Sequence, residues 1–341
     1  MRKRGKTGIL TKLNLTLLCW LSAVAVSNSQ DVSFSQYYSN PLYLNPAFAG
    51  TIGAPRVALQ YRDQWQHMDG AYTSYSAAFD APVKKLQGGL GIYLLNDAQA
   101  SQMLNSFQVN AAYSVRVQLN EDYFFHGGIQ IGYAENTLKT NQLVFADNLE
   151  NNNGIPGTSA EVFTDPKFSY LDYSFGLLVY NKRVFGGLAI HHLTEPDLTF
   201  SEESTSESKL PRKYSLHAGA RLPVFRHGHL RKKFDVSPQI IFQKQGVSDQ
   251  INYGMFATKH GFTGGAWFRQ NFGLRYDAVI LLVGYTTPWV QFTYSYDWTV
   301  SGLAGQTGGT SEISLSFVLN KRRDPGRLPF FVPYEERFGG E

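Results

Sequence analysis

In the stretch WVQFTYSYDW, residues 289–298, apolar or aromatic side chains alternate with polar ones from Val290 onward. The large apolar and aromatic residues fall on one face, at Val290, Phe292, Tyr294, Tyr296 and Trp298. The polar residues fall on the other face, at Gln291, Thr293, Ser295 and Asp297. A period of two is the period of a β-strand, so the stretch predicts a strand with one apolar and one polar face.

The same alternation recurs through the chain after residue 55. It is clear in residues 107–117 and 312–320, and shorter versions occupy 73–80, 125–133 and 214–222. We expect about fourteen antiparallel strands, an even number as in bacterial single-chain barrels, although twelve or sixteen stay open. They begin near Arg56, Ala71, Gly89, Leu104, Tyr123, Ser169, Arg183, Arg212, Lys233, Gln250, Phe262, Tyr276, Trp289 and Glu312.

The residue types on the two faces separate a membrane barrel from a soluble β domain, which is the alternative. Strands of a soluble sandwich are shorter and carry more charge where they meet water. Here the polar faces hold mostly Ser, Thr, Gln, Asn, Gly and His, and aromatic residues often end the strands. The pattern therefore predicts an all-β, transmembrane outer-membrane β-barrel, with a polar lumen and an outer face that contacts outer-membrane lipid.

The lengths of the connections predict the orientation of this barrel. The longest ones, residues 136–168, 194–211 and 301–310, all follow odd-numbered strands, whereas connections after even-numbered strands are mostly short. Outer-membrane barrels have long extracellular loops and short periplasmic turns. We therefore expect both chain ends to be periplasmic.

Residues 1–29 have the pattern of a secretory signal peptide. A basic start precedes a short apolar run and then small residues, and the run is too short for a typical membrane-spanning helix, the alternative. The single cysteine, Cys19, lies within it, so we expect no thiol chemistry in the mature chain. Five of the 31 Lys and Arg residues and none of the 27 acids lie in this segment, so the mature charge is 26 − 27 = −1. That balance argues against nucleic-acid binding.

Between the signal peptide and the first strand, residues 30–55 include FSQYYSNPLYLNPAFAGT, with two Asn-Pro steps. Pro41 and Pro46 argue against both a central strand and a helix, so we expect an irregular segment. It is either a plug in the lumen or a periplasmic docking surface. Five exposed Tyr and Phe side chains would make an unusually sticky surface, which favours a plug for part of the segment. The candidate partner-binding or plug residues are Tyr37, Tyr38, Asn40, Pro41, Asn45, Pro46 and Phe48.

Gly-Gly pairs recur in the strand patterns, in LQGGLG, FFHGGI, VFGGLA and FTGGAW. They open no helix, which argues against a phosphate-binding loop. Glycine within a strand permits a bend or the close approach of another backbone. The second interpretation fits a segment packed inside the lumen.

Catalytic and metal-binding residues are not evident, and we expect no enzyme, metal or other cofactor. His191 and His192 are adjacent on a predicted strand, so we expect their side chains on opposite faces. His217, Arg221 and Ser215 share a polar face, which we interpret as lumen lining. No set of nucleophile, base and orienting residue is apparent.

After the barrel, residues 56–320, the sequence ends in a tail, residues 321–341, which contains three prolines and the apolar residues Phe330, Phe331 and Tyr334. The prolines rule out a further interior strand. We interpret the tail as a periplasmic docking arm, and the alternative is a disordered extension.

The segment before residue 100 resembles the PorP/SprF family of type IX secretion system membrane proteins of Bacteroidota. The residues that carry the resemblance are FSQYY and PLYLNPAFAG, with YRDQW at 61–65, YTSYSAAFDAP at 72–82 and GGLGIYLLND at 88–97. The resemblance implies an outer-membrane accessory of secretion and gliding motility, whose partners are periplasmic ring components and a large secreted adhesin. The alternative is a passive or selective channel for small solutes, which a barrel of this size could form.

Overall fold

The computed structural model describes residues 31–68, 70–139, 167–198, 209–225, 232–287, 289–302 and 304–319. The predicted signal peptide, residues 1–29, and the tail, residues 321–341, lie outside these ranges. Three short helical elements occur in the described residues, namely α2 (Pro41–Leu44), η1 (Pro46–Phe48) and η2 (Lys84–Leu86). None of the helices described is long and apolar enough to cross a bilayer.

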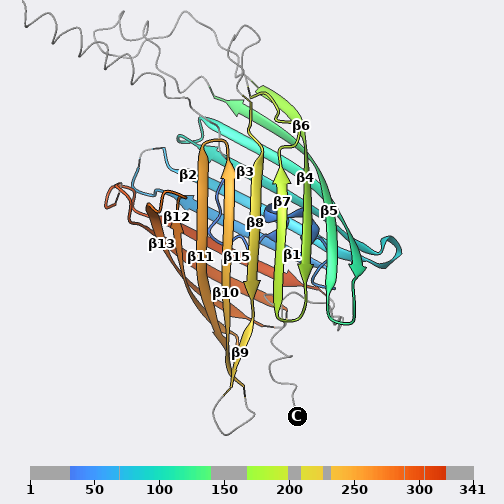
Figure 1. Cartoon of the computed structure of the whole chain (residues 1–341). Coiled ribbons are helices and arrows are strands. Elements are labelled where there is room, and N and C mark those ends of the chain that lie inside the picture. Colours follow the sequence, from blue (N-terminus) through green and yellow to red (C-terminus); the bar gives the residue numbers. More distant parts are fainter. Residues whose placement is uncertain are drawn as a thin grey trace, which may run out of the picture.

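The remaining regular elements are strands, which alternate in direction along one continuous wall (Figure 1). In chain order they are β1 (Arg56–Gln64), β2 (Tyr72–Val83), β3 (Gly88–Gln99), β4 (Leu104–Gln118), β5 (Phe124–Leu138), β6 (Lys167–Tyr180), β7 (Val184–His191), β8 (Lys213–Ala220), β9 (Leu222–Phe225), β10 (Lys232–Gln245), β11 (Ser248–Lys259), β12 (Phe262–Gln270), β13 (Tyr276–Thr286), β14 (Val290–Thr299) and β15 (Thr310–Val318).

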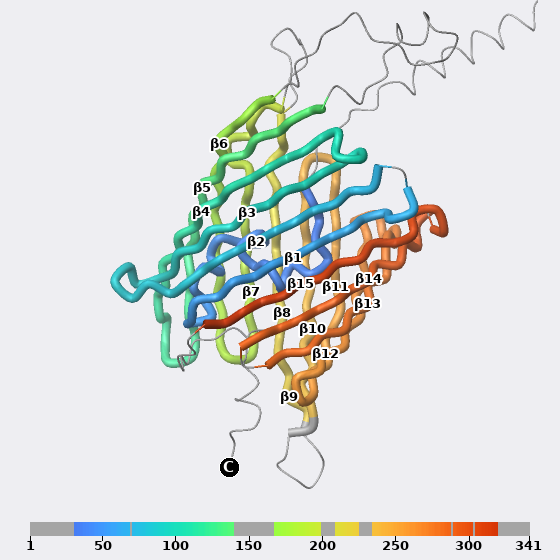
Figure 2. Tube along the Cα trace, turned by 180° about the vertical axis from the view of Figure 1, so that it is seen from behind, coloured from blue at the N-terminus to red at the C-terminus, as the bar shows by residue number. Residues whose placement is uncertain are grey.

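The wall is a closed barrel of fourteen strands, which confirms the predicted fold class. β8 and β9 act as one strand interrupted at Arg221, because β10 pairs with both of them in sequence. β10 also pairs with β11, and β15 pairs with β1, so every edge of the sheet is joined to a neighbour. Figure 2 shows β15 and β1 side by side at this closure. Closure matters because backbone groups at an open edge would be unsatisfied in lipid.

The two faces of the strands have the polarity that the alternation predicts. In β14, Phe292 and Trp298 are 45% and 63% exposed, whereas Ser295 is fully buried. Exposed Leu, Ile, Val, Tyr and Phe side chains cover the outside of most other strands in the same way. The apolar face therefore points outward, and in most strands the face toward the lumen is polar.

Both ends of the wall lie at one rim. Arg56 pairs with Val318, and the Leu319 N–H donates to the Pro55 carbonyl at 2.8 Å. We call this end the terminal rim, and the opposite end, where β5 and β7 end and β6 and β8 begin, the loop rim. The short turn at η2 lies at the terminal rim, since it joins β2 to β3.

Candidate functional site

Residues 31–54, which we call the internal segment, lie inside the barrel (Figures 1 and 2). The two prolines start the helical turns α2 and η1, where the missing N–H costs no hydrogen bond. The Asn45 side chain caps η1 by accepting the Ala47 N–H at 2.8 Å. The expectation of no helix here is therefore wrong: the Asn-Pro steps build two short helical turns that fit within the lumen, because proline is tolerated at the first position of a helix.

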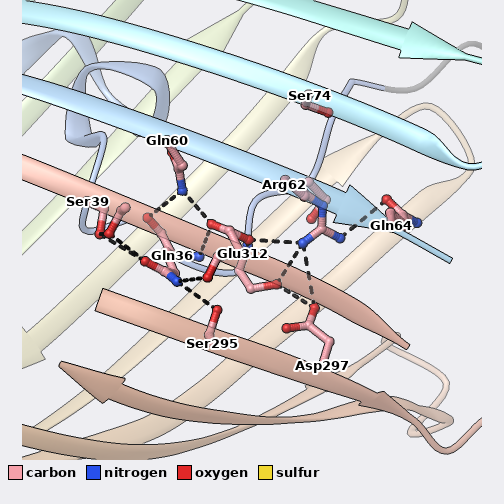
Figure 3. Close-up of polar contacts among 12 residues, drawn as sticks. Gln36, Ser39, Gln60, Arg62, Gln64, Ser74, Ser295, Asp297 and Glu312 are labelled. Carbon is pink, nitrogen blue, oxygen red and sulfur yellow. Dashed lines mark hydrogen bonds and ion pairs between the residues drawn. The ribbon is translucent and has the colours of Figure 1, made fainter. Parts of the chain in front are cut away.

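The first anchor of the internal segment is the carboxylate of Glu312 on β15 (Figure 3). It accepts the Ser35 N–H at 2.8 Å and the Gln36 N–H at 2.9 Å. The Gln36 side chain donates to the Glu312 carbonyl at 2.8 Å and to Ser295 Oγ at 2.9 Å. Gln60 on β1 donates to the same carboxylate. These bonds fix both the backbone and the side chain of the segment against β14, β15 and β1.

Two arginines balance the acids at this anchor. Arg62 Nη1 lies 3.0 Å from Glu312 Oε2, and Arg269 Nη1 lies 3.1 Å from Asp297 Oδ2. The Ser35 hydroxyl accepts from Arg62 at 3.0 Å and from Arg269 at 2.6 Å. Removal of one member of a buried ion pair leaves an uncompensated charge, which is strongly destabilising. We call these five residues the Ser35 cluster.

A second anchor, the Asp31 cluster, lies on the opposite side of the lumen. Asp31 Oδ2 is 2.8 Å from His192 Nε2 and 3.3 Å from Lys213 Nζ. His192 Nδ1 is 2.9 Å from Asp172 Oδ2 on β6, so the imidazole is held between two carboxylates. Tyr43 adds its ring beneath Lys213, with Nζ 4.8 Å from the ring centroid. The cluster joins the start of the internal segment to β6, the end of β7 and β8.

The charges in the Asp31 cluster shift the pKa values of its members. Burial alone would lower the pKa of His192, but the carboxylates of Asp31 and Asp172 outweigh it and raise this pKa to about 9. Burial alone would raise the pKa of Asp31, but His192 and Lys213 hold it well below its usual range. At neutral pH the cluster therefore contains a protonated His192 and an ionised Asp31.

The prediction that His191 and His192 point to opposite faces is wrong. His192 follows the end of β7 with a φ of 57°, in the left-handed region, which breaks the strand alternation. Both imidazoles are consequently buried, with ring centroids 6.4 Å apart. His191 Nε2 lies 3.2 Å from the Leu44 carbonyl, so both histidines contact the internal segment.

The glycine pairs of β3 and β5 let the internal segment touch the wall backbone. A Cβ on Gly89 would collide with the backbone of Ala49, and one on Gly128 would collide with that of Ala47. The interpretation of these glycines as points of close approach is confirmed for LQGGLG and FFHGGI. In VFGGLA and FTGGAW, by contrast, the inward glycines Gly187 and Gly265 face side chains of the wall, which are those of His217 and Phe256.

The lumen is apolar along part of its wall, which differs from the prediction of a polar lumen throughout. Trp267, Ile280 and Leu282 on β12 and β13 point inward and are buried. Tyr37 packs edge-on against Trp267 with centroids 5.3 Å apart, and Tyr38 against Phe256 at 4.9 Å. The aromatic side chains of the internal segment thus replace water on this part of the wall.

Seven of the candidate residues come together in the internal segment, and all seven are buried. They are Tyr37, Tyr38, Asn40, Pro41, Asn45, Pro46 and Phe48. Phe330, Phe331 and Tyr334 lie outside the described residues. Sequence reasoning missed Asp31, Ser35 and Gln36 and their charged partners, because each strand contributes only one or two of those charges. The only signal in the sequence for these partners is a single charged residue, such as Asp297, on the otherwise uncharged polar face of a strand.

The lumen residues are suited to holding a polypeptide. Asn45 Nδ2 donates to the backbone carbonyls of Leu177 on β6 and Leu188 on β7, both at 3.0 Å. Among the described residues, no group of three or more His, Cys, Asp or Glu side chains could hold a metal ion. Main-chain and side-chain hydrogen bonds of this kind recognise a specific peptide conformation.

A closed antiparallel wall with an apolar exterior and a chain-filled interior defines an outer-membrane β-barrel. The sequence model of the family "Type IX secretion system membrane protein PorP/SprF" matches residues 26–317, and the chain belongs to this family. It is therefore a non-catalytic membrane barrel of the type IX secretion system.

No curated protein matches the chain. Solved structures that resemble it include the toluene transporter TodX of P. putida, with a TM-score of 0.47 and 10% identity over 82% of this chain and 93% of that one. A FadL homologue of Pseudomonas aeruginosa gives a TM-score of 0.41 and 10% identity over 80% and 94%. The KdgM porin gives 0.36 and 8% over 78% and 99%.

Proposed function

We propose that this protein is a non-enzymatic accessory of the type IX secretion and gliding machinery, which supports the secretion or surface attachment of a large adhesin. In this proposal the internal segment is a plug that makes the barrel a rigid, closed scaffold. The observation that carries it is the attachment of one short segment to opposite sides of the lumen, through the Ser35 and Asp31 clusters.

The distribution of the anchors supports a plug. The Ser35 cluster holds the segment to β1, β12, β14 and β15, and the Asp31 cluster holds it to β6 and β8. Asn45 bonds to β6 and β7, and the backbone next to it touches β3 and β5. A segment fixed to strands around the whole circumference leaves little free cross-section for solutes.

We infer that the terminal rim is periplasmic, where the tail after residue 320 would meet the ring components of the machine. The expectation of a periplasmic N-terminal end does not fit this orientation, because Asp31 contacts His192, Lys213 and Gln245 at strand ends of the loop rim. Two features support this orientation: both ends of the wall lie at the terminal rim, and the strands that precede and follow the long connections end and begin at the loop rim. The loop rim would then face the adhesin outside the cell. The tail after residue 320 would serve as the periplasmic docking arm.

Crosslinking in native membranes followed by purification tests the accessory role. We expect periplasmic ring proteins and a large surface adhesin to copurify with the barrel. A variant without residues 327–341 should lose the ring proteins but still insert in the membrane. Recovery of the same ring proteins with this variant would remove the docking arm from the proposal.

Conductance in planar bilayers separates the scaffold from a solute channel, which the width of a fourteen-stranded barrel favours. The intact protein should be nearly silent, and a variant without residues 31–54 should conduct steadily. A matched variant of the loop rim, Glu135→Ala, should stay silent. Steady conductance by the intact protein would favour the channel and contradict the plug.

A further inference from the structure

We propose that the outer wall over β6, β7 and β8 binds one anionic phospholipid, with an acyl chain in a groove at Gly186 and the headgroup on Lys182 and Arg183. The groove has a volume of about 390 Å³. Its lining is almost wholly apolar and includes Phe125, Leu177, Leu188, Leu216, Ile240 and Phe242. We call it the Gly186 groove.

The groove exists because small residues meet on the outward face. Gly186 pairs with Ala218 on β8, and Val179 of β6 is its partner on the other side. A Cβ at Gly186 would meet only the His217 carbonyl oxygen, at 3.9 Å. The surrounding Leu188 and Leu216 side chains are 39% and 54% exposed on the same outward face. The result is a depression in a surface that faces hydrocarbon.

Two cations lie beside this depression at the terminal rim. Lys182 and Arg183 are exposed in the turn between β6 and β7, and neither forms an ion pair with the described residues. Asn181 shapes this turn, because its Oδ1 accepts the Arg183 and Val184 N–H groups at 2.7 and 2.8 Å. The Arg183 carbonyl also accepts the Arg221 N–H at 2.6 Å. The backbone that carries the two cations is therefore held in a defined position.

The spacing between cations and groove matches a phospholipid. Arg183 precedes Gly186 by three residues, or about 10 Å along a strand. The headgroup layer on each side of a bilayer is roughly 5 to 8 Å thick, so a phosphate near Arg183 places the first acyl carbons at Gly186. Basic residues at the membrane surface attract anionic lipid headgroups. Charge complementarity thus selects an anionic lipid, rather than a zwitterionic one.

A second groove on the outer wall is similar in size and lining but differs in the cations beside it. It has a volume of about 460 Å³ and is lined by Leu59, Tyr61, Ala77, Leu94 and other residues. The first terminal-rim cation along β2, Lys84, is seven residues from Ala77, or about 23 Å. Arg56 is only three residues from Leu59, but it is buried and paired with Asp80 at 2.8 Å, so it is not available to a lipid headgroup. This groove should therefore not distinguish lipids by charge.

Native mass spectrometry of the full mature protein tests the proposal, with phosphatidylglycerol and phosphatidylcholine as the two probes. We expect one phosphatidylglycerol to remain bound in preference to phosphatidylcholine. Lys182→Gln with Arg183→Gln should reduce this retention roughly tenfold or more, because two surface cations are lost. Gly186→Val should also reduce it, since the new side chain fills the groove without a backbone collision.

Gly264→Val is the matched control, because Gly264 is an exposed strand glycine on β12 and no atom lies within 4 Å of the position that a Cβ would occupy there. It should retain phosphatidylglycerol as the parent protein does. All variants should keep the gel mobility shift on heating that folded barrels show. Equal retention of the two lipids would overturn the proposal, as would undiminished retention by folded Gly186→Val. Equal retention of the two lipids is the result expected if Glu121 and Asp122 of the neighbouring turn neutralise the charges of Lys182 and Arg183.

Discussion

The backbone N–H of Ser35 donates to the carboxylate of Glu312 at 2.8 Å, across 277 residues of sequence. The same carboxylate accepts the next N–H, that of Gln36, at 2.9 Å. Two successive amides on one buried acid define the direction of the chain as well as its position. The last strand of the barrel thereby holds the segment that precedes the first strand.

Replacement of Glu312 by Ala should release the internal segment. The change removes the acceptor for both amides and leaves Arg62 with only the Asp297 carboxylate, 3.7 Å away. Breaking a buried pair typically costs about 3–5 kcal/mol. We expect protease cleavage within residues 31–54 and an increase in conductance.

The control for this change is Glu135→Ala. Glu135 pairs with Lys167 at 3.6 Å, but both side chains are well exposed, so the pair contributes about 1 kcal/mol or less. Cleavage of the internal segment should not change in this variant. An unchanged cleavage pattern for Glu312→Ala would show that the carboxylate is dispensable for anchoring.

Gly128→Ala should displace the internal segment, whereas Gly127→Ala should not. A Cβ on Gly128 would collide with the Ala47 backbone inside the lumen, while one on Gly127 would meet only side-chain carbons at 3.7 Å or more. The two positions are adjacent on β5, so their effects on the strand itself should be similar. Hydrogen exchange of the amides of residues 45–50 measures the difference. Equal exchange in the two variants would contradict the close approach.

Leu42→Ala should loosen the internal segment without unfolding the wall. Leu42 is fully buried and belongs to a cluster with Phe34, Ala49 and Tyr93. Truncation of a buried leucine costs about 2–5 kcal/mol. We expect faster hydrogen exchange in residues 36–50 and little change in the melting of the barrel.

Leu90→Ala is the comparison for Leu42→Ala, since Leu90 lies on the outer face with 44% exposure. The internal segment should exchange at the parental rate in this variant. If both variants speed up exchange equally, the effect comes from the wall and not from the packing of Leu42.

The Asp31 cluster should hold the internal segment between about pH 4 and pH 9. The pKa of His192 is raised to about 9 in the fold, so its contribution is complete below its ordinary pKa of 6.5 and disappears as the pH rises through 9. The pKa of Asp31 is lowered, so its contribution is present above its ordinary value of 3.8 and disappears at more acidic pH.

Protease cleavage near Asp31, measured as a function of pH, tests this window. Cleavage should increase above about pH 9 in the parent protein, and His192→Gln should remove that step. Tyr43 stays neutral across the range, because burial raises its pKa well above 10. A His192→Gln variant that retains the alkaline step would assign the step to another group.

The sequence alone determined the wall of this protein. Alternation in stretches such as residues 289–298 is a local property, since side chains at i and i+2 share a face whatever the strand pairs with. The strand starts near Arg56, Leu104 and Phe262 agree with β1, β4 and β12 for this reason. The prolines likewise ruled out a strand at residues 41–46 by local sterics.

Only the tertiary structure decided what the lumen holds. Arg62, Arg269 and Asp297 stand on different strands, and only the closure and shear of the barrel bring them to one serine hydroxyl. His192 turned inward because its left-handed backbone ended the alternation of β7. Contacts between residues more than 200 positions apart depend on the register of the whole sheet, and no local period encodes that register.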